Sequence, residues 1–157
     1  MRRILLLFLV LTCVQGCDSN RIYERNYDLT DKMWASDNVM RFEFEVETSK
    51  EPVNLYFNVR NSLSYPFQNL YVKYTLKDTL DQVFSEELIN YNLFDIKTGK
   101  PFGSGIGDVF DHRIELLGNY KFKNPGKYLV DLQHYMRPDT LNEIVSIGLR
   151  LELVSNE

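Results

Sequence analysis

The chain has 157 residues, of which 44% are hydrophobic, 25% charged and 13% aromatic, a composition that argues against general disorder and indicates one packed domain. Its formal net charge is −4. Removal of residues 1–16 would leave sixteen basic against twenty-two acidic residues, a net charge of −6, which argues against a nucleic-acid partner.

The N-terminus has the features of an export signal. Arg2 and Arg3 form a short positive segment, and residues 4–11 form a continuous apolar run. A transmembrane helix needs roughly 20 apolar residues, so this run predicts a cleaved signal rather than a permanent membrane span.

The residues ahead of Cys17 resemble the bacterial lipobox, with Val14 three positions before the cysteine and the small Gly16 directly before it. The resemblance implies that residues 1–16 are a lipoprotein signal peptide and that Cys17 receives lipid, which would anchor the chain to a membrane. Ordinary signal-peptidase cleavage near Gly16 is the alternative. After cleavage Cys17 is the sole cysteine, so a disulfide, a thiol nucleophile and a cysteine zinc site are excluded from the mature chain.

Residues 17–40 are predicted to form the lipidated cysteine and a tether. The sequence there is polar and lacks a clean period, and Tyr23, Tyr27 and Trp34 are irregularly spaced. A single tryptophan in such a segment is expected to dock on the edge of the folded domain rather than stay exposed.

Beyond Arg41 the hydrophobic period becomes two, which is typical of half-buried strands. In the first such segment Phe42, Phe44 and Val46 alternate with three glutamates. The stretch 86–89 is compatible with a strand or with a helical turn. Further strands are predicted at residues 53–60, 70–76, 109–116, 127–136 and 144–154, with weaker candidates at residues 83–89 and 91–96.

No long helical pattern separates these segments, so parallel β-α-β units are disfavoured. The sequence therefore predicts an all-β fold in which residues 41–157 form an antiparallel β-sandwich. An immunoglobulin-like and a jelly-roll-like arrangement both remain open, because alternation does not encode strand order.

Gly103, Gly105 and Gly107, at every second position, form the most distinctive local pattern. A phosphate-binding loop of the nucleotide-binding type needs a helix directly after it, whereas a strand is predicted here. We therefore expect a turn or a bulge in this segment.

Asp108, Asp111 and His112 are candidate cation ligands, since carboxylates suit calcium and imidazole suits zinc. On a strand Asp111 points away from the other two, so no metal site and no cofactor are predicted. Neither His112 nor His134 has a recognisable catalytic setting, so no catalytic residues and no enzymatic activity are predicted. His134 alternates with apolar residues and is expected to be a hydrogen-bonded structural histidine.

Aromatic side chains leave a second interpretation open. Tyr56, Tyr65 and Tyr71 lie in or beside predicted strands, where exposed rings are able to stack on sugars or to contact proteins. A periplasmic glycan- or ligand-binding module is therefore an alternative function.

A set of residues follows in order along most of the chain. The set comprises the lipobox ending at Cys17, Trp34, residues 54–61, Tyr65 and Pro66, Asn69 and Leu70, the glycine segment with Asp108, residues 125–128, Met136 and Arg137, and residues 147–150. Taken in order, this set resembles the gliding motility lipoprotein GldH family of Bacteroidota. The resemblance implies a membrane lipoprotein without catalytic activity that supports surface gliding and, with other Gld proteins of the envelope, the type 9 secretion apparatus.

The predicted lipid anchor and the family resemblance imply that the protein is located in the cell envelope. Residues 18–21 lack the acidic run that resembles surface-export signals of Bacteroidota lipoproteins, so the anchored domain is expected to face the periplasm. Inner and outer membrane both remain open.

A subset of polar and aromatic residues is available for interaction or for the framework of the fold. Arginine and asparagine side chains commonly satisfy strand ends and turns, so a structural role is at least as well supported as a binding role. The candidates are Trp34, Arg60, Asn61, Tyr65, Asn69, Asp108, Arg137 and Arg150.

Overall fold

The computed structural model describes residues 20–47 and 50–154. Within these ranges the fold is all-β, as predicted, with one short 3-10 turn, η1 (Thr30–Lys32). The strands are β1 (Arg21–Asp28), β2 (Met33–Ala35), β3 (Met40–Val46), β4 (Val53–Ser62), β5 (Asn69–Asp78), β6 (Val83–Asn92), β7 (Ser104–Ile106), β8 (Val109–Tyr120), β9 (Gly126–His134), β10 (Thr140–Asn142) and β11 (Ile144–Leu153).

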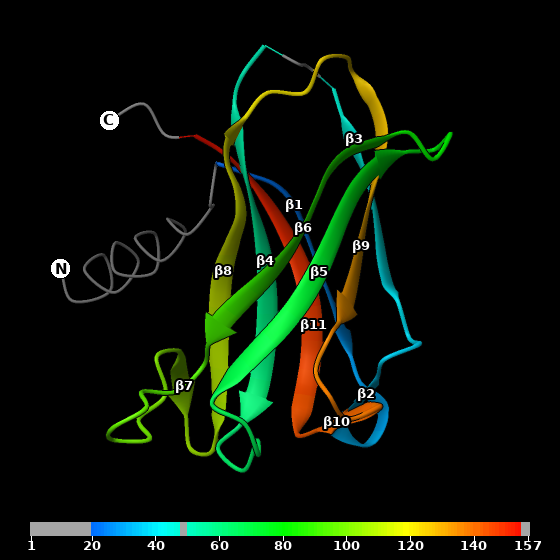
Figure 1. Ribbon diagram of the computed structural model, residues 1–157. Coiled ribbons are helices and arrows are strands. Elements are labelled where there is room, and N and C mark those ends of the chain that lie inside the picture. Colours follow the sequence, from blue (N-terminus) through cyan, green and yellow to red (C-terminus); the bar gives the residue numbers. More distant parts are fainter. Residues whose placement is uncertain (1–19, 48–49, 155–157) are drawn as a thin grey trace, which may run out of the picture.

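Two sheets form the body of the molecule. The five-stranded sheet has the order β1-β11-β4-β8-β7, and the four-stranded sheet has the order β3-β9-β5-β6. Figure 1 shows the four-stranded sheet in front of the five-stranded one, with the ribbon of β2 and β10 at one end. Every strand pair in the described ranges is antiparallel, so the predicted antiparallel class is confirmed.

The core lies between the two sheets and is formed by the apolar residues that alternate with polar ones along the strands. In β3 every second residue from Met40 to Val46 is buried, whereas Arg41 and the intervening glutamates are exposed. Burial of one large apolar side chain stabilises the fold by about 1.5–3 kcal/mol. The largest side chains without solvent exposure include Trp34, Tyr74, Phe42 and Phe57.

The structure corrects the predicted tether from Arg21 onward. β1 pairs with β11 along its length and forms an edge of the five-stranded sheet. Tyr23 and Tyr27 turn inward, and their ring centroids lie 5.7 Å from Phe44 and 5.2 Å from Phe42. Only these two aromatic residues indicate the inner face of the strand, and its other apolar residue, Ile22, is exposed, so the period was too weak to predict a strand. The signal peptide and Cys17 lie outside the described residues.

Trp34, expected to dock on the domain edge, is fully buried from strand β2. Its Nε1 donates a hydrogen bond of 2.9 Å to the carbonyl oxygen of Asn38. The indole contacts Phe57 of the five-stranded sheet and His134 of the four-stranded sheet, at centroid distances of 6.5 and 5.2 Å. The segment after β1 is thereby packed into the core.

Two further predictions have clear outcomes. Residues 83–92 form one continuous strand, so the helical-turn reading of residues 86–89 is wrong. The glycine segment forms a tight hairpin between β7 and β8, and Gly107 adopts a φ of +73° in its turn, so the expected turn is confirmed.

The sandwich has two distinct ends. β1 begins at the N-terminal end, which also carries Glu47, residues 50–52 and the connections 79–82 and 121–125. The far end carries the connections 63–68, 93–103 and 135–139, together with the β7–β8 turn. In the described part of the chain, no helix is long and apolar enough to cross a membrane.

Candidate functional site

The described residues form two candidate binding surfaces, one polar and one apolar. Among the described residues no three His, Cys, Asp or Glu side chains gather as a metal site would require. His112 is buried without a hydrogen-bond partner on either ring nitrogen, and burial lowers its pKa, which favours the neutral imidazole. His134 accepts a long hydrogen bond of 3.4 Å from the Met136 amide, as expected of a structural histidine.

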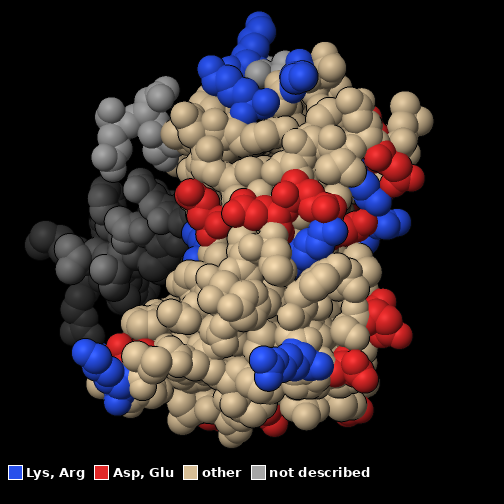
Figure 2. All heavy atoms as spheres, in the orientation of Figure 1, with Lys and Arg blue, Asp and Glu red and all other residues tan. Residues whose placement is uncertain are grey.

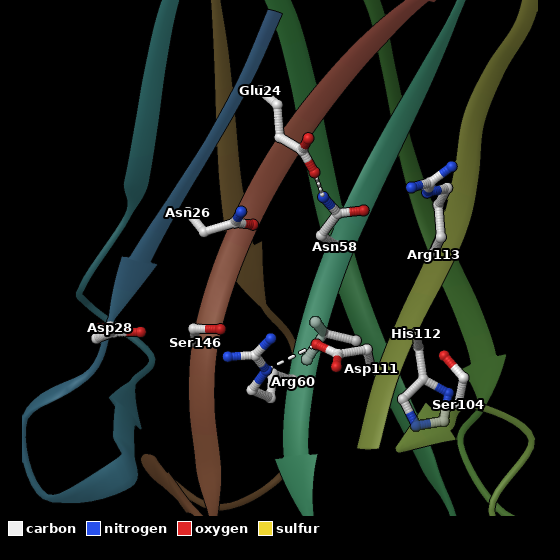
Figure 3. Close-up of a pocket in the computed structure, with 11 residues that line it drawn as sticks. Glu24, Asn26, Asp28, Asn58, Arg60, Ser104, Asp111, His112, Arg113 and Ser146 are labelled. Atoms are coloured by element: carbon white, nitrogen blue, oxygen red, sulfur yellow. Dashed lines mark hydrogen bonds and ion pairs between the residues drawn. The ribbon is translucent and has the colours of Figure 1, made fainter. Parts of the chain in front are cut away.

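A polar groove lies on the outer face of the five-stranded sheet (Figure 3). The strand register aligns Asn26 of β1, Gly148 of β11 and Asn58 of β4 in one row across the sheet. The next row holds Asp28, Ser146 and Arg60 at the matching positions. Because the two β11 positions carry small residues, a hollow of about 500 Å³ opens between the longer side chains.

Gly148 is required for this arrangement. A Cβ atom there would lie 1.8 Å from Oδ1 of Asn26 and 2.9 Å from the carbonyl oxygen of Arg25. The glycine therefore allows the Asn26 amide to lie over the middle strand, where it borders the groove.

Most of the charged side chains of the groove have a polar or charged partner. Nε of Arg60 donates a 2.7 Å hydrogen bond to Oδ1 of Asp111, which raises the arginine pKa, and Nδ2 of Asn58 donates to Oε1 of Glu24 at 3.2 Å. Nη1 of Arg113 donates to Oε1 of Glu152 at 3.2 Å. The groove thus presents amides, hydroxyls and side chains of both charges, three acidic and two basic, which suits a polar ligand better than a strongly charged one.

Arg150 lies on the same face of the sheet, in the row next to Gly148 on the side of the N-terminal end. Its side chain is only 5% exposed, and Nη1 lies 2.6 Å from Oε2 of Glu24. Its Nε also donates to Glu152. Burial alone would raise the pKa of Glu24, but hydrogen bonds from Arg21 and Arg150 outweigh burial and lower it. Arg150 therefore ties β11 to β1 and is part of the framework.

A second candidate, which we call the far-end apolar surface, lies on the other sheet and continues onto the far end. One hollow of about 410 Å³ is lined mainly by apolar side chains, with Arg137 at its side, and a second of about 290 Å³ adjoins it through Phe67, which lines both. The surface comprises Leu63, Phe67, Tyr71, Leu88, Ile96, Phe102, Ile106, Tyr135, Met136 and Pro138.

The exposure of this surface is unusual for apolar side chains. Ile106 is 95% exposed at the hairpin tip, Ile96 is 76% exposed and Phe102 is 58% exposed. Figure 2 shows acidic and basic groups as a band across the middle of this face, with a largely uncharged area between the band and the far end. Exposed apolar side chains grouped at one end of a domain are typical of interaction sites.

Ion pairs on the four-stranded sheet form a charged boundary to the apolar area. Arg41 makes two hydrogen bonds to Asp131, of 2.7 and 2.9 Å, and Nζ of Lys77 lies 3.1 Å from the same carboxylate. Burial opposes ionisation of Asp131, but the hydrogen bonds from Arg41 and Lys77 outweigh it and lower its pKa. Lys73 pairs with Glu86 at 2.9 Å.

The residues singled out by sequence do not form one site. Arg60 and Arg150 share the outer face of the five-stranded sheet in different rows, whereas Arg137 lies beside the apolar hollow of the other sheet. Asp108 accepts a 2.7 Å hydrogen bond from the Leu63 amide through its backbone carbonyl.

Three other candidates have framework contacts. Asn61 is buried, with Nδ2 donating to the Ser62 carbonyl at 2.9 Å. The Tyr65 hydroxyl donates at 3.2 Å to the carbonyl of Asn69, whose own Nδ2 donates at 2.6 Å to Asn90. The structure therefore brings Tyr65 and Asn69 together at the start of β5.

Sequence reasoning missed several residues that line these surfaces. Asn26 and Asp28 fell in the segment interpreted as a tether, although they alternate with the inward Tyr27. Phe102 and Ile106 were not singled out because an exposed apolar residue in a glycine-rich segment has the same sequence pattern as a buried one.

Comparison with known proteins gives a consistent result. The sequence model of the family described as GldH lipoprotein matches residues 21–151. The chain is 29% identical over 148 residues to a protein of Christiangramia forsetii named gliding motility lipoprotein GldH homolog, with 90% of this chain and 89% of that protein covered. It is 28% identical over 154 residues to the gliding motility lipoprotein GldH of Flavobacterium johnsoniae, with 94% of both covered.

Among solved structures, the infectious bursal disease virus VP2 subviral particle aligns with a TM-score of 0.40 and 10% sequence identity. The alignment covers 88% of this chain, which spans 34% of that viral protein.

Proposed function

The chain belongs to the GldH lipoprotein family, and we propose that it is a non-catalytic lipoprotein, anchored through Cys17, that acts by protein contact. Its role is that of an accessory or assembly component of the gliding motility and type 9 secretion machinery. The role in gliding motility is inferred from the names of the two relatives. The role in type 9 secretion is inferred from the resemblance to the GldH family. The proposed partners are other proteins of that machinery in the envelope.

The far-end apolar surface carries this proposal. It comprises two hollows and, at the same end of the sandwich, strongly exposed side chains such as Ile106 and Phe102, and exposed apolar side chains grouped in this way are typical of protein–protein contact. β11 runs between the two ends of the sandwich, and its ten residues span about 33 Å at roughly 3.3 Å each. A membrane anchor just before β1 therefore leaves the far end facing other proteins rather than the bilayer.

The anchored domain faces the periplasm in this proposal. Cys17 precedes Arg21, the first residue of β1, by four positions, so the sandwich stays close to the membrane that carries the lipid. Either membrane of the envelope satisfies this arrangement.

The polar groove supports a second candidate function, the binding of a glycan or another polar ligand. Its amides, carboxylates and hydroxyls offer donors and acceptors of the kind that sugar hydroxyls need. Two observations weaken this candidate: Tyr65 is buried and is not available for stacking, and no Phe, Tyr or Trp is among the described residues that line the groove. We therefore rank protein contact first.

Photocrosslinking in membranes of the native host separates the two functions. A benzoylphenylalanine residue replaces Ile106 in one variant and Glu45, an exposed residue of β3, in the matched control. Discrete protein adducts from position 106 and none from position 45 support the proposal. Equal adduct patterns from both positions, or saturable glycan binding that is lost when the groove residue Asn26 is replaced by alanine, contradict it.

A further inference from the structure

The N-terminal end of the sandwich carries exposed lysines although the domain as a whole is acidic. Lys121 and Lys123 project from the β8–β9 connection, and Lys50 lies in the β3–β4 connection of the same end. Figure 2 shows basic groups together at the top of the molecule in this view. Among the described residues, neither Lys121 nor Lys123 has an ion-pair or hydrogen-bond partner.

Chain length ties this end to the anchor. Four residue steps join Cys17 to Arg21, and each step spans at most about 3.5 Å, so the lipidated residue lies within about 14 Å of the start of β1. β1 begins at the N-terminal end of the sandwich. An acylated Cys17 therefore holds the lysines of this end near the lipid headgroups.

We propose that the N-terminal end of the sandwich lies against anionic lipid headgroups, with Lys121 and Lys123 contacting headgroup phosphates. The inference rests on the proposed anchor at Cys17 and adds an orientation to it. Glu47 and Glu51 lie in the β3–β4 connection of the same end, so the contact is made chiefly by the β8–β9 connection.

The contact gives the anchored domain a defined direction. A lysine at an anionic surface favours binding by about fivefold, the equivalent of about 1 kcal/mol, so two lysines favour the contacting orientation by about 25-fold. The acidic remainder of the domain is repelled by the same surface. The result is that the far-end apolar surface points away from the membrane, toward its partners.

The test uses the mature acylated chain in lipid nanodiscs. Because acylation occupies the Cys17 thiol, an introduced cysteine is the sole site for a fluorophore. Asn124→Cys reports the β8–β9 connection, and Ile106→Cys reports the far end; both positions are exposed. A nitroxide on the lipid headgroup quenches a fluorophore that lies close to the bilayer surface.

We expect strong quenching at position 124 and little at position 106 in discs that contain phosphatidylglycerol. The double variant K121E/K123E is expected to lower the contacting fraction at position 124, as does a rise in salt concentration. The matched variant K97E/K100E changes two exposed lysines of the far end and is expected to leave the quenching unchanged.

Three outcomes overturn the inference. The first is equal quenching at positions 124 and 106, and the second is unchanged quenching at position 124 in K121E/K123E. The third is quenching at position 124 that is as strong in discs of phosphatidylcholine alone as in discs that contain phosphatidylglycerol. A salt-dependent contact with an acidic protein, without headgroup quenching, would replace the lipid by a protein partner. The intact mass of the same sample reports the acylation of Cys17 separately, so failure of the anchor is distinguishable from failure of the headgroup contact.

Discussion

Arg150 and Glu24 form an ion pair, with Nη1 and Oε2 2.6 Å apart, that connects the C-terminal strand β11 to the edge strand β1. The arginine side chain is 5% exposed and the glutamate 21% exposed, so both charges are largely removed from water. A buried guanidinium is costly without its partners. The pair therefore makes β1 an integral part of the sheet and contributes one wall of the polar groove.

Replacing Glu24 by alanine is expected to lower the free energy of unfolding by about 1–3 kcal/mol, because Arg150 then loses a buried partner. Urea denaturation followed by circular dichroism measures the change. Glu43→Ala is the matched control, since Glu43 pairs with Lys127 at an exposed site and its loss is expected to cost less than about 1 kcal/mol. Equal costs for the two variants would show that the Arg150 pair is not special.

Trp34→Ala is expected to destabilise the fold by about 3–5 kcal/mol, because the side chain is fully buried between the two sheets. Trp34 is also the sole tryptophan, so its fluorescence follows the N-terminal segment alone. In the wild type, tryptophan emission and circular dichroism are expected to change at the same urea concentration. An earlier change in emission would mean that residues 21–35 detach before the sandwich unfolds.

These two predictions concern the segment where sequence and structure diverge. The strands with strong alternation were predictable, as in the edge strand β3, where buried Phe42 and Phe44 are separated by an exposed glutamate. β1 was not predictable, because none of its residues is fully buried and only Tyr23 and Tyr27 indicate its inner face.

The candidate surfaces were less predictable than the strands. The groove depends on the register that sets Asn26 and Asn58 on either side of Gly148, and residues so distant in sequence show no pattern before the sheet order is known. The far-end apolar surface was not predictable, because the sequence does not indicate whether an apolar side chain such as that of Phe102 is exposed or buried.

Gly148→Ala is expected to destabilise the chain by about 1–3 kcal/mol, because the added Cβ meets both the Asn26 amide and the backbone oxygen of Arg25. The double variant G148A/N26A is expected to recover only part of the loss, since the backbone contact remains. Thermal or urea denaturation of the two variants measures the recovery. Full recovery would assign the whole cost to the Asn26 side chain.

The stability of the four-stranded sheet is expected to depend on acid through Asp131. Its pKa is lower in the folded chain than in the unfolded chain, so the stabilisation is complete above the unfolded value of about 3.9 and is lost as the pH falls through the folded value. Urea titrations at pH 7 and at stepwise lower pH should show Asp131→Asn less stable than wild type at pH 7, with the gap closing in acid. A gap independent of pH would exclude this origin.

The double variant I106D/F102D is expected to leave the free energy of unfolding within about 0.5 kcal/mol of wild type, because both side chains are exposed. The same variant is expected to remove the protein adducts formed at the far end, which a photocrosslinking residue at Ile96 would detect. Adducts that persist in the double variant would place the contact elsewhere on the molecule.

The central claim is that an anchored, non-catalytic domain supports the machinery through contacts of its far end. The most direct measurement compares the secreted protein profile and the spreading of a deletion strain complemented with wild type, Cys17→Ser or I106D/F102D. We predict that secretion and spreading fail in the deletion strain and that only the wild type restores both. Normal secretion and spreading in the deletion strain, or full restoration by Cys17→Ser, would contradict the account.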